Sequence, residues 1–281
     1  MQTPATSEPS PPLVETFAAE APSPVLILCD HAGKVVPGGL GRLGIDEEAL
    51  SRHIGWDIGA ADLTRALARR LRAPAILNHC SRLVIDANRR PWSPTSIPPV
   101  SDGCVVPGNR DLPDGEVRER IRSYFIPYHR VVARRIGAFR RAGVVPAIVS
   151  LHSFTPRMDG QDRPWHVGVL WRHDRRISDP ALAALRARPG LVVGDNQPYS
   201  GLGEFGFTIE FHTQRTRLPH VMFEVRQDQI DTADKAERWA GILAEAVAPA
   251  LASPDLYTVL DHTNEERTGL EAISWRHGSR L

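Results

Sequence analysis

The chain has 281 residues, of which 42% are hydrophobic, which is enough for one large domain or two small ones. Its 34 basic and 33 acidic residues give a formal net charge of +1, which disfavours a nucleic-acid or membrane-surface partner. The three cysteines, and the lack of an apolar run near the ~20 residues of a membrane helix, predict a cytoplasmic protein without a disulfide framework.

The composition divides the chain into three parts. Residues 1–23 are rich in Pro, Ser, Thr and acids, which predicts a flexible leader. Residues 24–252 contain no linker and are predicted to form a single domain. Residues 253–281 are mostly polar and irregular, and we expect an arm that packs on the domain or on a partner chain.

Strand and helix patterns alternate along most of the chain. Apolar runs predict strands over residues 25–28, 74–80, 82–89, 146–153, 166–171, 191–196, 207–211 and 220–225. Helical spacing predicts helices over residues 46–73, 114–142 and 231–251, and a short one from Ser178. Residues 91–113 are rich in proline and predict a long loop. The alternation predicts a three-layer α/β/α fold around a mixed, mainly parallel sheet.

Polar residues of the metal-binding type follow three of the predicted strands. Asp30 and His31 come after the first strand, His152 after the strand at 147–151, and Glu224 after the strand at 221–223. Ligands of open α/β sheets bind at the carboxyl ends of the strands, where residues distant in sequence converge. His53 and Asp57 are four residues apart, which predicts that they share one face of a helix.

These residue types indicate a catalytic metal. A catalytic zinc takes three protein ligands and leaves one position for water. The sequence predicts His31, His152 and Asp57 as these ligands, with Glu224 as the general base. His53 and Asp30 are the alternatives for the third ligand, and Asp30 is otherwise expected to orient His31. Each residue also has a structural interpretation, such as a hydrogen-bonded histidine at a strand end or a surface pair of Glu224 with Arg226.

Six short motifs occur in the order found in the N-formylglutamate amidohydrolase family: DHAG, HIGWDIGA, SRLVIDANR, LHSFTP, DNQPYSG and RLPHVMFEVRQDQI. The resemblance covers about residues 24–250. It implies a fold similar to that of zinc carboxypeptidases and aspartoacylases. It also implies hydrolysis of the N-formyl amide of glutamate, which releases formate and glutamate in histidine degradation.

The resemblance also implies roles for further residues. The segment DANR is similar to a carboxylate-binding segment of these enzymes, which implies that Asn88 and Arg89 contact a substrate carboxylate. Arg82, Arg226, Arg215 and Arg217 are the candidates for the second carboxylate, and the first two are our predicted contacts. His212 matches a family site position, which implies a catalytic role at the oxyanion.

One departure from the related carboxypeptidases concerns the first metal site. These enzymes carry H-x-x-E there, but the fourth position in this chain is Lys34. The missing glutamate is the reason for assigning the third ligand to Asp57.

The sequence therefore predicts a hydrolase that depends on zinc or another divalent metal. Its substrate would be the N-formyl or another N-acyl amide of glutamate or a similar small amino acid. We expect a monomer or a small homo-oligomer that binds neither nucleic acid nor membrane. The alternatives are a hydrolase of a different small amide, and a non-catalytic binder of small ligands on the same fold.

Overall fold

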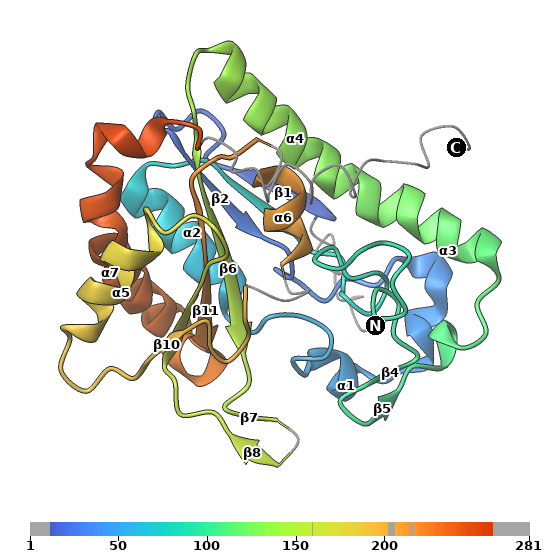
Figure 1. Ribbon diagram of the computed structural model, residues 1–281. Helices are drawn as coiled ribbons and strands as arrows, with labels where there is room; N and C mark the ends of the chain where they lie inside the picture. The colour runs from blue at the N-terminus through green and yellow to red at the C-terminus, as the bar shows by residue number, and fades with distance from the viewer. Residues whose placement is uncertain (1–11, 159, 202–205, 214–215, 261–281) are drawn as a thin grey trace, which may run out of the picture.

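The computed structural model describes residues 12–158, 160–201, 206–213 and 216–260. In these segments a mixed sheet lies between two layers of helices (Figure 1). None of the helices in these segments combines the length and the apolarity that crossing a bilayer requires.

Seven strands form the central sheet of the described part, in the order β1-β3-β2-β6-β11-β9-β10. The strands are β1 (Val14–Phe17), β2 (Val25–Cys29), β3 (Ala75–Asn78), β6 (Ala147–Phe154), β9 (Val167–Leu170), β10 (Val193–Asp195) and β11 (His220–Arg226). The β3–β2, β2–β6 and β6–β11 pairs are parallel. The β1–β3 and β11–β9 pairs are antiparallel. This mixed, mainly parallel sheet confirms the predicted fold class.

The helices form the two outer layers. One face of the sheet carries α2 (Ala60–Leu71), α5 (Ser178–Arg186) and α7 (Ala233–Leu251), and the other carries α4 (Ile126–Arg141) and α6 (Phe207–Thr213) (Figure 1). Helices α1 (Glu47–Ser51) and α3 (Asp114–Arg120) lie beyond the sheet, and a π-helical turn (Ile121–Phe125) joins α3 to α4. Two small hairpins pair β4 (Val100–Ser101) with β5 (Cys104–Val105) and β7 (Arg157–Met158) with β8 (Gln161–Asp162).

Strand alternation decides which side chains face each layer. On β6, Val149 and Leu151 pack in the core under α2 and α7, whereas Ile148 packs in the core under α4. Because side chains alternate with a period of two, His152 lies on the same face as Ile148. On β11 the same alternation places Met222 and Glu224 on the α4 side of the sheet.

Three predicted elements differ from the structure. The predicted flexible leader is wrong for Val14–Phe17, because this segment pairs antiparallel with β3 at the sheet edge. Residues 82–89 form turns instead of a strand, because their backbone bonds to nearby loop residues: the N–H of Val84 donates to Ser81 (2.9 Å) and that of Asp86 to Ser96 (2.7 Å). Residues 207–211 belong to helix α6, where the backbone N–H groups of Phe207 and Thr208 are bound by Asn88 oxygens (3.4 and 3.0 Å). Asn88 therefore replaces a local cap and favours the helix over the predicted strand.

The predicted helix over 46–73 is interrupted. Helices α1 and α2 are separated by residues 52–59, so the prediction that His53 and Asp57 share one helix face is wrong. Gly59 has a left-handed backbone (φ 79°), and a Cβ atom there would lie 2.0 Å from the Ile230 carbonyl oxygen. Helix α1 has already ended at Ser51, and the left-handed turn at Gly59 comes directly before α2, so no single helix spans residues 46–73.

The segment after α7 packs on the domain as far as it is described. Leu256 is buried in the core under α7. Residues 261–281, which make up most of the predicted arm, lie outside the described residues.

Replacing Gly59 with Ala should lower the free energy of unfolding by about 2 kcal/mol or more, because alanine disfavours the left-handed backbone and its Cβ meets a carbonyl oxygen. Urea unfolding measures this change. Gly115→Ala is the matched control, since no atom lies within 4 Å of a Cβ atom there and α3 favours alanine. Equal stability of the two variants would contradict this account of the helix break.

Candidate metal centre

The carboxyl ends of the parallel strands bring the predicted residues together. Asp30 and His31 follow β2, His152 lies on β6, and Glu224 lies on β11. Glu224 is the register partner of His152, and β2 pairs with the other side of β6. All four side chains are at least nine-tenths buried. The parallel pairing therefore gathers, at one edge of the sheet, residues that are far apart in sequence.

Asp57 reaches this edge from the break between α1 and α2. Its backbone N–H donates to the carbonyl oxygen of His31 (2.9 Å), and its Oδ2 atom accepts a bond from the backbone N–H of Ser153 (3.3 Å). The side chain is 1% exposed. The interruption of the helix is therefore the feature that places Asp57 beside the two histidines.

His31, Asp57 and His152 form a candidate metal-binding group. Their ligand atoms all lie within 4.8 Å of one another. Oδ2 of Asp57 is 2.9 Å from Nδ1 of His152 and 3.3 Å from Nδ1 of His31. The group contains the predicted third ligand, Asp57, and neither of its alternatives. His53 is nearby, with its Nδ1 atom 3.7 Å from Oδ1 of Asp57.

The second nitrogen of each imidazole ring is held by another carboxylate. Nε2 of His31 is 2.7 Å from Asp86, and Nε2 of His152 is 3.1 Å from Asp30. Carboxylates that hold the outer nitrogen of metal-ligating histidines fix the tautomer and the orientation of the ring. When each Nε2 atom donates to its carboxylate, the lone pairs of both Nδ1 atoms point toward Asp57. Such a convergence of lone pairs fits a cation.

The structure corrects the role expected of Asp30. We predicted that it orients His31, but it contacts His152, while Asp86 contacts His31. Tyr128 of α4 donates its hydroxyl to Asp30 (2.7 Å), so the contact to His152 is anchored in the helical layer. Nothing in the sequence distinguished Tyr128 from other apolar-face residues of its helix. Asp86 stands at the head of the DANR motif, which was the available signal.

Two opposing effects, burial and charge pairing, set the pKa values of the group. Burial lowers the pKa of His152, but hydrogen bonds to Asp30 and Asp57 outweigh it and raise this pKa well above its ordinary value. Burial likewise raises the pKa of Asp57, but the His31 charge and the bond to His152 hold it well below its usual range. The carboxylates therefore stay ionised and attract positive charge to the space between them.

Arg82 connects two of the carboxylates. Its guanidinium donates to Asp57 (3.2 Å) and to Asp86 (2.9 and 3.2 Å). Burial disfavours its charged form, but the two carboxylates outweigh this and raise its pKa further. We predicted that Arg82 binds substrate. It does line the cavity described next, but its donors already hold the metal-binding group in place.

A cavity of about 660 Å³ opens over the group. Pockets of this size hold small-molecule ligands. Its walls include the predicted residues His31, Asp57, Arg82, Asn88, Arg89, His152 and Glu224. Parts of the Pro-rich loop and of the β7–β8 hairpin also line it, so the long loop predicted over 91–113 contributes to this cavity.

Glu224 lines the cavity beside the metal-binding group. Burial raises its pKa to about 7, although the charge of His152 opposes this shift. Among the described residues its Oε2 atom has no hydrogen-bond partner. A carboxyl group with a pKa near neutrality can accept and return a proton at physiological pH.

Two predicted residues lie elsewhere. Arg226 is not among the cavity-lining residues: it ends β11, where it donates to Asp228 (2.7 and 3.1 Å) and to the carbonyl oxygens of Arg163 and Pro164 (3.2 and 3.3 Å). These bonds hold the Arg226 guanidinium at the end of β11, away from the cavity. The predicted contact of Arg226 with substrate is therefore wrong in this structure. Of the alternatives, Arg217 lines a different, smaller cavity, and Arg215 lies outside the described residues.

His212 also lies away from the cavity wall. It is buried on α6, and its Nε2 atom is 3.0 Å from Nδ1 of His129. Nε2 of His129 is 3.0 Å from the carbonyl oxygen of Ala87, which can only accept a hydrogen bond. A neutral His129 therefore donates at Nε2 and accepts at Nδ1 from His212. The predicted oxyanion role of His212 does not fit this position.

The fold and this group define an α/β protein with a candidate metal centre at the carboxyl edge of its sheet. A family model described as N-formylglutamate amidohydrolase matches residues 23–230, which contain every residue of the group. The chain belongs to this family.

Two solved structures share the fold of this chain. A gene product from Agrobacterium tumefaciens is 34% identical, with a TM-score of 0.83 over 86% of this chain and 96% of that chain. An N-formylglutamate amidohydrolase from Ralstonia eutropha JMP134 is 18% identical, with a TM-score of 0.62 over 85% of this chain and 96% of that chain, which shows a likeness in fold. A comparison with curated proteins gives no match.

The buried pair of His129 and His212 should make the protein sensitive to acid. Burial lowers their pKa values from 6.5 to about 4 and about 3. Below pH 6.5 the unfolded chain therefore binds protons that the folded chain excludes, so stability falls as the pH drops toward 4. Replacing His212 with Gln should reduce this loss by up to about 1.4 kcal/mol per pH unit. Urea unfolding between pH 7 and 4 measures the slope, and equal slopes for variant and wild type would contradict the assignment.

Proposed function

We propose that the protein is a metal-dependent hydrolase that cleaves the N-formyl or another small N-acyl amide of an amino acid. The observation that carries this proposal is the buried His31–Asp57–His152 group with Glu224 beside it in one cavity. Membership of the N-formylglutamate amidohydrolase family supports the reaction class, and the family's description makes N-formylglutamate the reference substrate.

The group fits a zinc ion. Two imidazole nitrogens and one carboxylate oxygen are a ligand set typical of catalytic zinc, and both imidazoles are already oriented by carboxylates. A zinc ion bound there supplies Lewis acidity, which polarises a substrate carbonyl and lowers the pKa of water.

Glu224 is the proton carrier of the proposed reaction. Its Oε2 atom has no hydrogen-bond partner among the described residues, and its pKa of about 7 lets it take a proton from the attacking water. The same carboxyl group then returns the proton to the leaving amine. The C–N bond breaks, a C–O bond forms, and the products are a carboxylate and an amino acid.

Asn88 and Arg89 are the proposed contacts for the carboxylate of the amino acid. Both line the cavity. Oδ1 of Asn88 accepts a hydrogen bond from the backbone N–H of Thr208 (3.0 Å), which fixes the orientation of its amide. An arginine guanidinium can bind a carboxylate with two parallel hydrogen bonds, so the pair is suited to hold the substrate beside Glu224.

Zinc-loaded protein should release formate from N-formyl amino acids, and a chelator should abolish this release. Glu224→Gln should retain zinc and lower kcat by about 10²–10⁴-fold, because the proton carrier is lost. His152→Ala should lose both zinc and turnover. Formate assays with metal analysis of each variant measure these effects. Chelator-insensitive release, or full activity of Glu224→Gln, would contradict the proposal, and ligand binding without turnover would favour a binding protein.

Asp86→Asn should weaken zinc binding about 10–100-fold, because the carboxylate that holds Nε2 of His31 is lost. Titration against a chelating dye measures the affinity. Asp174→Asn is the matched control, since Asp174 is also buried and paired with an arginine (2.6 Å to Arg176) but is not part of the group. If both variants bind zinc equally well, Asp86 does not support the metal site.

A further inference from the structure

Tyr199 lines the cavity but has no role in the proposed reaction. It belongs to the DNQPYSG motif, none of whose residues takes part in that reaction. Its side chain is half-buried, packs against the core cluster that contains Met222, and lines the same cavity as Glu224. Met222 and Glu224 are two residues apart on β11 and so share one face of the sheet. The Tyr199 ring therefore lies on the face that carries the proton carrier.

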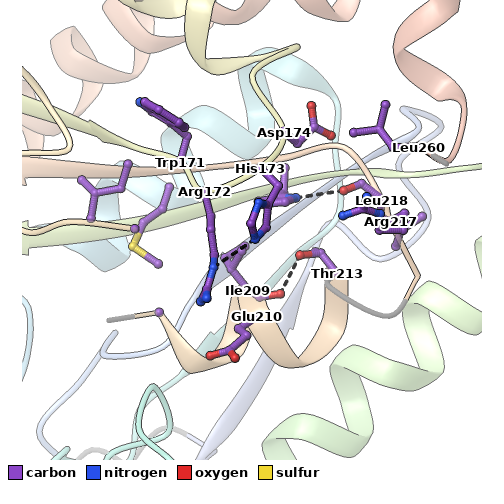
Figure 2. Close-up of a pocket in the computed structure, with 15 residues that line it drawn as sticks. Trp171, Arg172, His173, Asp174, Ile209, Glu210, Thr213, Arg217, Leu218 and Leu260 are labelled. Carbon is purple, nitrogen blue, oxygen red and sulfur yellow. Dashed lines mark hydrogen bonds between the residues drawn. The ribbon is translucent and has the colours of Figure 1, made fainter. Parts of the chain in front are cut away.

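The backbone around Tyr199 is held at both ends of the motif. Oδ1 of Asn196 accepts hydrogen bonds from the backbone N–H groups of Trp171 (3.0 Å) and Gly201 (3.2 Å). A Cβ atom at Gly201 would lie 2.4 Å from the Trp171 carbonyl oxygen, so the two backbones are in contact. Figure 2 shows Trp171 at the wall of the smaller cavity of about 50 Å³, which Gly201 also lines. The motif therefore presents Tyr199 to the larger cavity from a segment that is fixed against β9.

Arg163 holds the phenol end of Tyr199. Its Nη1 atom donates to the hydroxyl oxygen of Tyr199 (3.0 Å), and its guanidinium carbon lies 5.0 Å from the centre of the Tyr199 ring. The same carbon lies 5.9 Å from the ring centre of Phe154, which ends β6 two residues after His152. Arg163 is not among the residues that line the cavity. It therefore supports Tyr199 from behind, at the end of the strand that carries His152.

Arg163 is itself held through its backbone and its side chain. Its backbone N–H donates to the carbonyl oxygen of Pro156 (2.8 Å), and its own carbonyl oxygen accepts from the guanidinium of Arg226 (3.2 Å). Its Nη2 atom is 2.7 Å from Sδ of Met158. Arg226, which does not line the cavity, thus helps to fix the residue that orients Tyr199.

These contacts make the Tyr199 hydroxyl a hydrogen-bond donor. A guanidinium has no acceptor, so the hydroxyl oxygen accepts from Arg163 and directs its proton toward another group. Burial raises the pKa of Tyr199, and the charge of Glu224 adds to this shift, although the bond from Arg163 opposes it. The hydroxyl therefore keeps its proton at neutral pH and can donate it to a substrate beside Glu224.

The proposed reaction creates a negative charge that needs such a donor. When water adds to the acyl carbon, an electron pair moves onto the acyl oxygen, and donors aimed at that oxygen stabilise the transition state. The resemblance to the family implied His212 for this role. His212 does not line the cavity and is engaged with His129, so the donor must come from another element.

We propose that Tyr199 is a catalytic residue that donates a hydrogen bond to the acyl oxygen of the substrate, and that Arg163 is the residue that positions it. The inference rests on the proposed function and adds a residue to the same site. Water forms a C–O bond to the acyl carbon while Glu224 takes a proton from it, and the C=O electron pair moves onto the acyl oxygen beside Tyr199. This pair returns when the C–N bond breaks and Glu224 gives the proton to the amine. Tyr199 keeps its own proton throughout.

The test replaces Tyr199 with Phe, which removes only the hydroxyl, and measures kcat and KM of the zinc-loaded protein for N-formyl-L-glutamate and N-formyl-L-alanine. The value of kcat should fall about 10²-fold for both substrates, because the lost donor serves the acyl oxygen that they share. The value of KM should change less than about twofold, because the hydrogen bond strengthens only in the transition state. Metal analysis should show the same zinc content as in the wild type.

Tyr257→Phe is the matched control. Tyr257 is also half-buried and donates its hydroxyl to a protein acceptor, the carbonyl oxygen of Leu251 (2.9 Å), but it does not line the cavity. This variant should leave kcat and KM unchanged for both substrates.

Arg163→Gln tests the positioning role. It should lower kcat about tenfold in the presence of Tyr199, because the phenol is no longer held in place. In the Tyr199→Phe background it should lower kcat much less, because the hydroxyl that it positions is already missing. Equal losses in the two backgrounds would show that Arg163 acts on the fold and not through Tyr199.

The outcomes separate the inference from the function on which it rests. An unchanged kcat in Tyr199→Phe overturns the inference and leaves the hydrolase function standing. A rise in KM confined to the glutamate derivative also overturns it, because the hydroxyl would then bind the side-chain carboxylate. Loss of zinc from Tyr199→Phe overturns it as well, since the residue would then support the metal-binding group. If the zinc-loaded wild type hydrolyses neither substrate, the proposed function fails and the inference fails with it.

Discussion

The site depends on two buried contacts between carboxylates and imidazoles, Asp86 with His31 and Asp30 with His152. Each contact occupies the outer nitrogen of its ring and turns the inner nitrogen toward Asp57. Buried ionised carboxylates are costly unless they are paired, so the arrangement is stable only when positive charge lies among them. Protons on the imidazoles or a metal ion supply this charge. The surrounding fold holds this set of acids and imidazoles out of water.

Each layer of the fold contributes to this arrangement. The parallel strands set the spacing of His152 and Glu224 through their register, and the turn at Gly59 begins α2 just after Asp57. Tyr128 of helix α4 donates its hydroxyl to Asp30 and so holds this carboxylate in place. The pairing of β11 with β9 places an apolar surface directly beside the proton carrier.

The sequence predicted the parts of the site that depend on strand ends. Apolar runs ending in His31, His152 and Glu224 are visible without a structure, because a buried strand that ends in polar residues is a local pattern. The position of Asp57 was predicted for the wrong reason, since the chain is not helical between α1 and α2 and the turn at Gly59 packs against the distant Ile230 carbonyl. The side-chain partners of Asp30, Arg226 and His212 are set by tertiary packing, which single-sequence patterns do not record. Helix α6 also resembled a strand because its first N–H groups are bound by Asn88, which is 120 residues away from Thr208 in the chain.

The central claim is that His31, Asp57 and His152 hold one metal ion through the two Nδ1 atoms and a carboxylate oxygen. Anomalous X-ray diffraction at the zinc absorption edge, from crystals of the zinc-loaded protein, tests it most directly. The account predicts one strong anomalous peak within bonding distance of these three side chains, with Asp86 and Asp30 still on the Nε2 atoms. A peak elsewhere, or a zinc bound through Nε2 of either histidine, would contradict it.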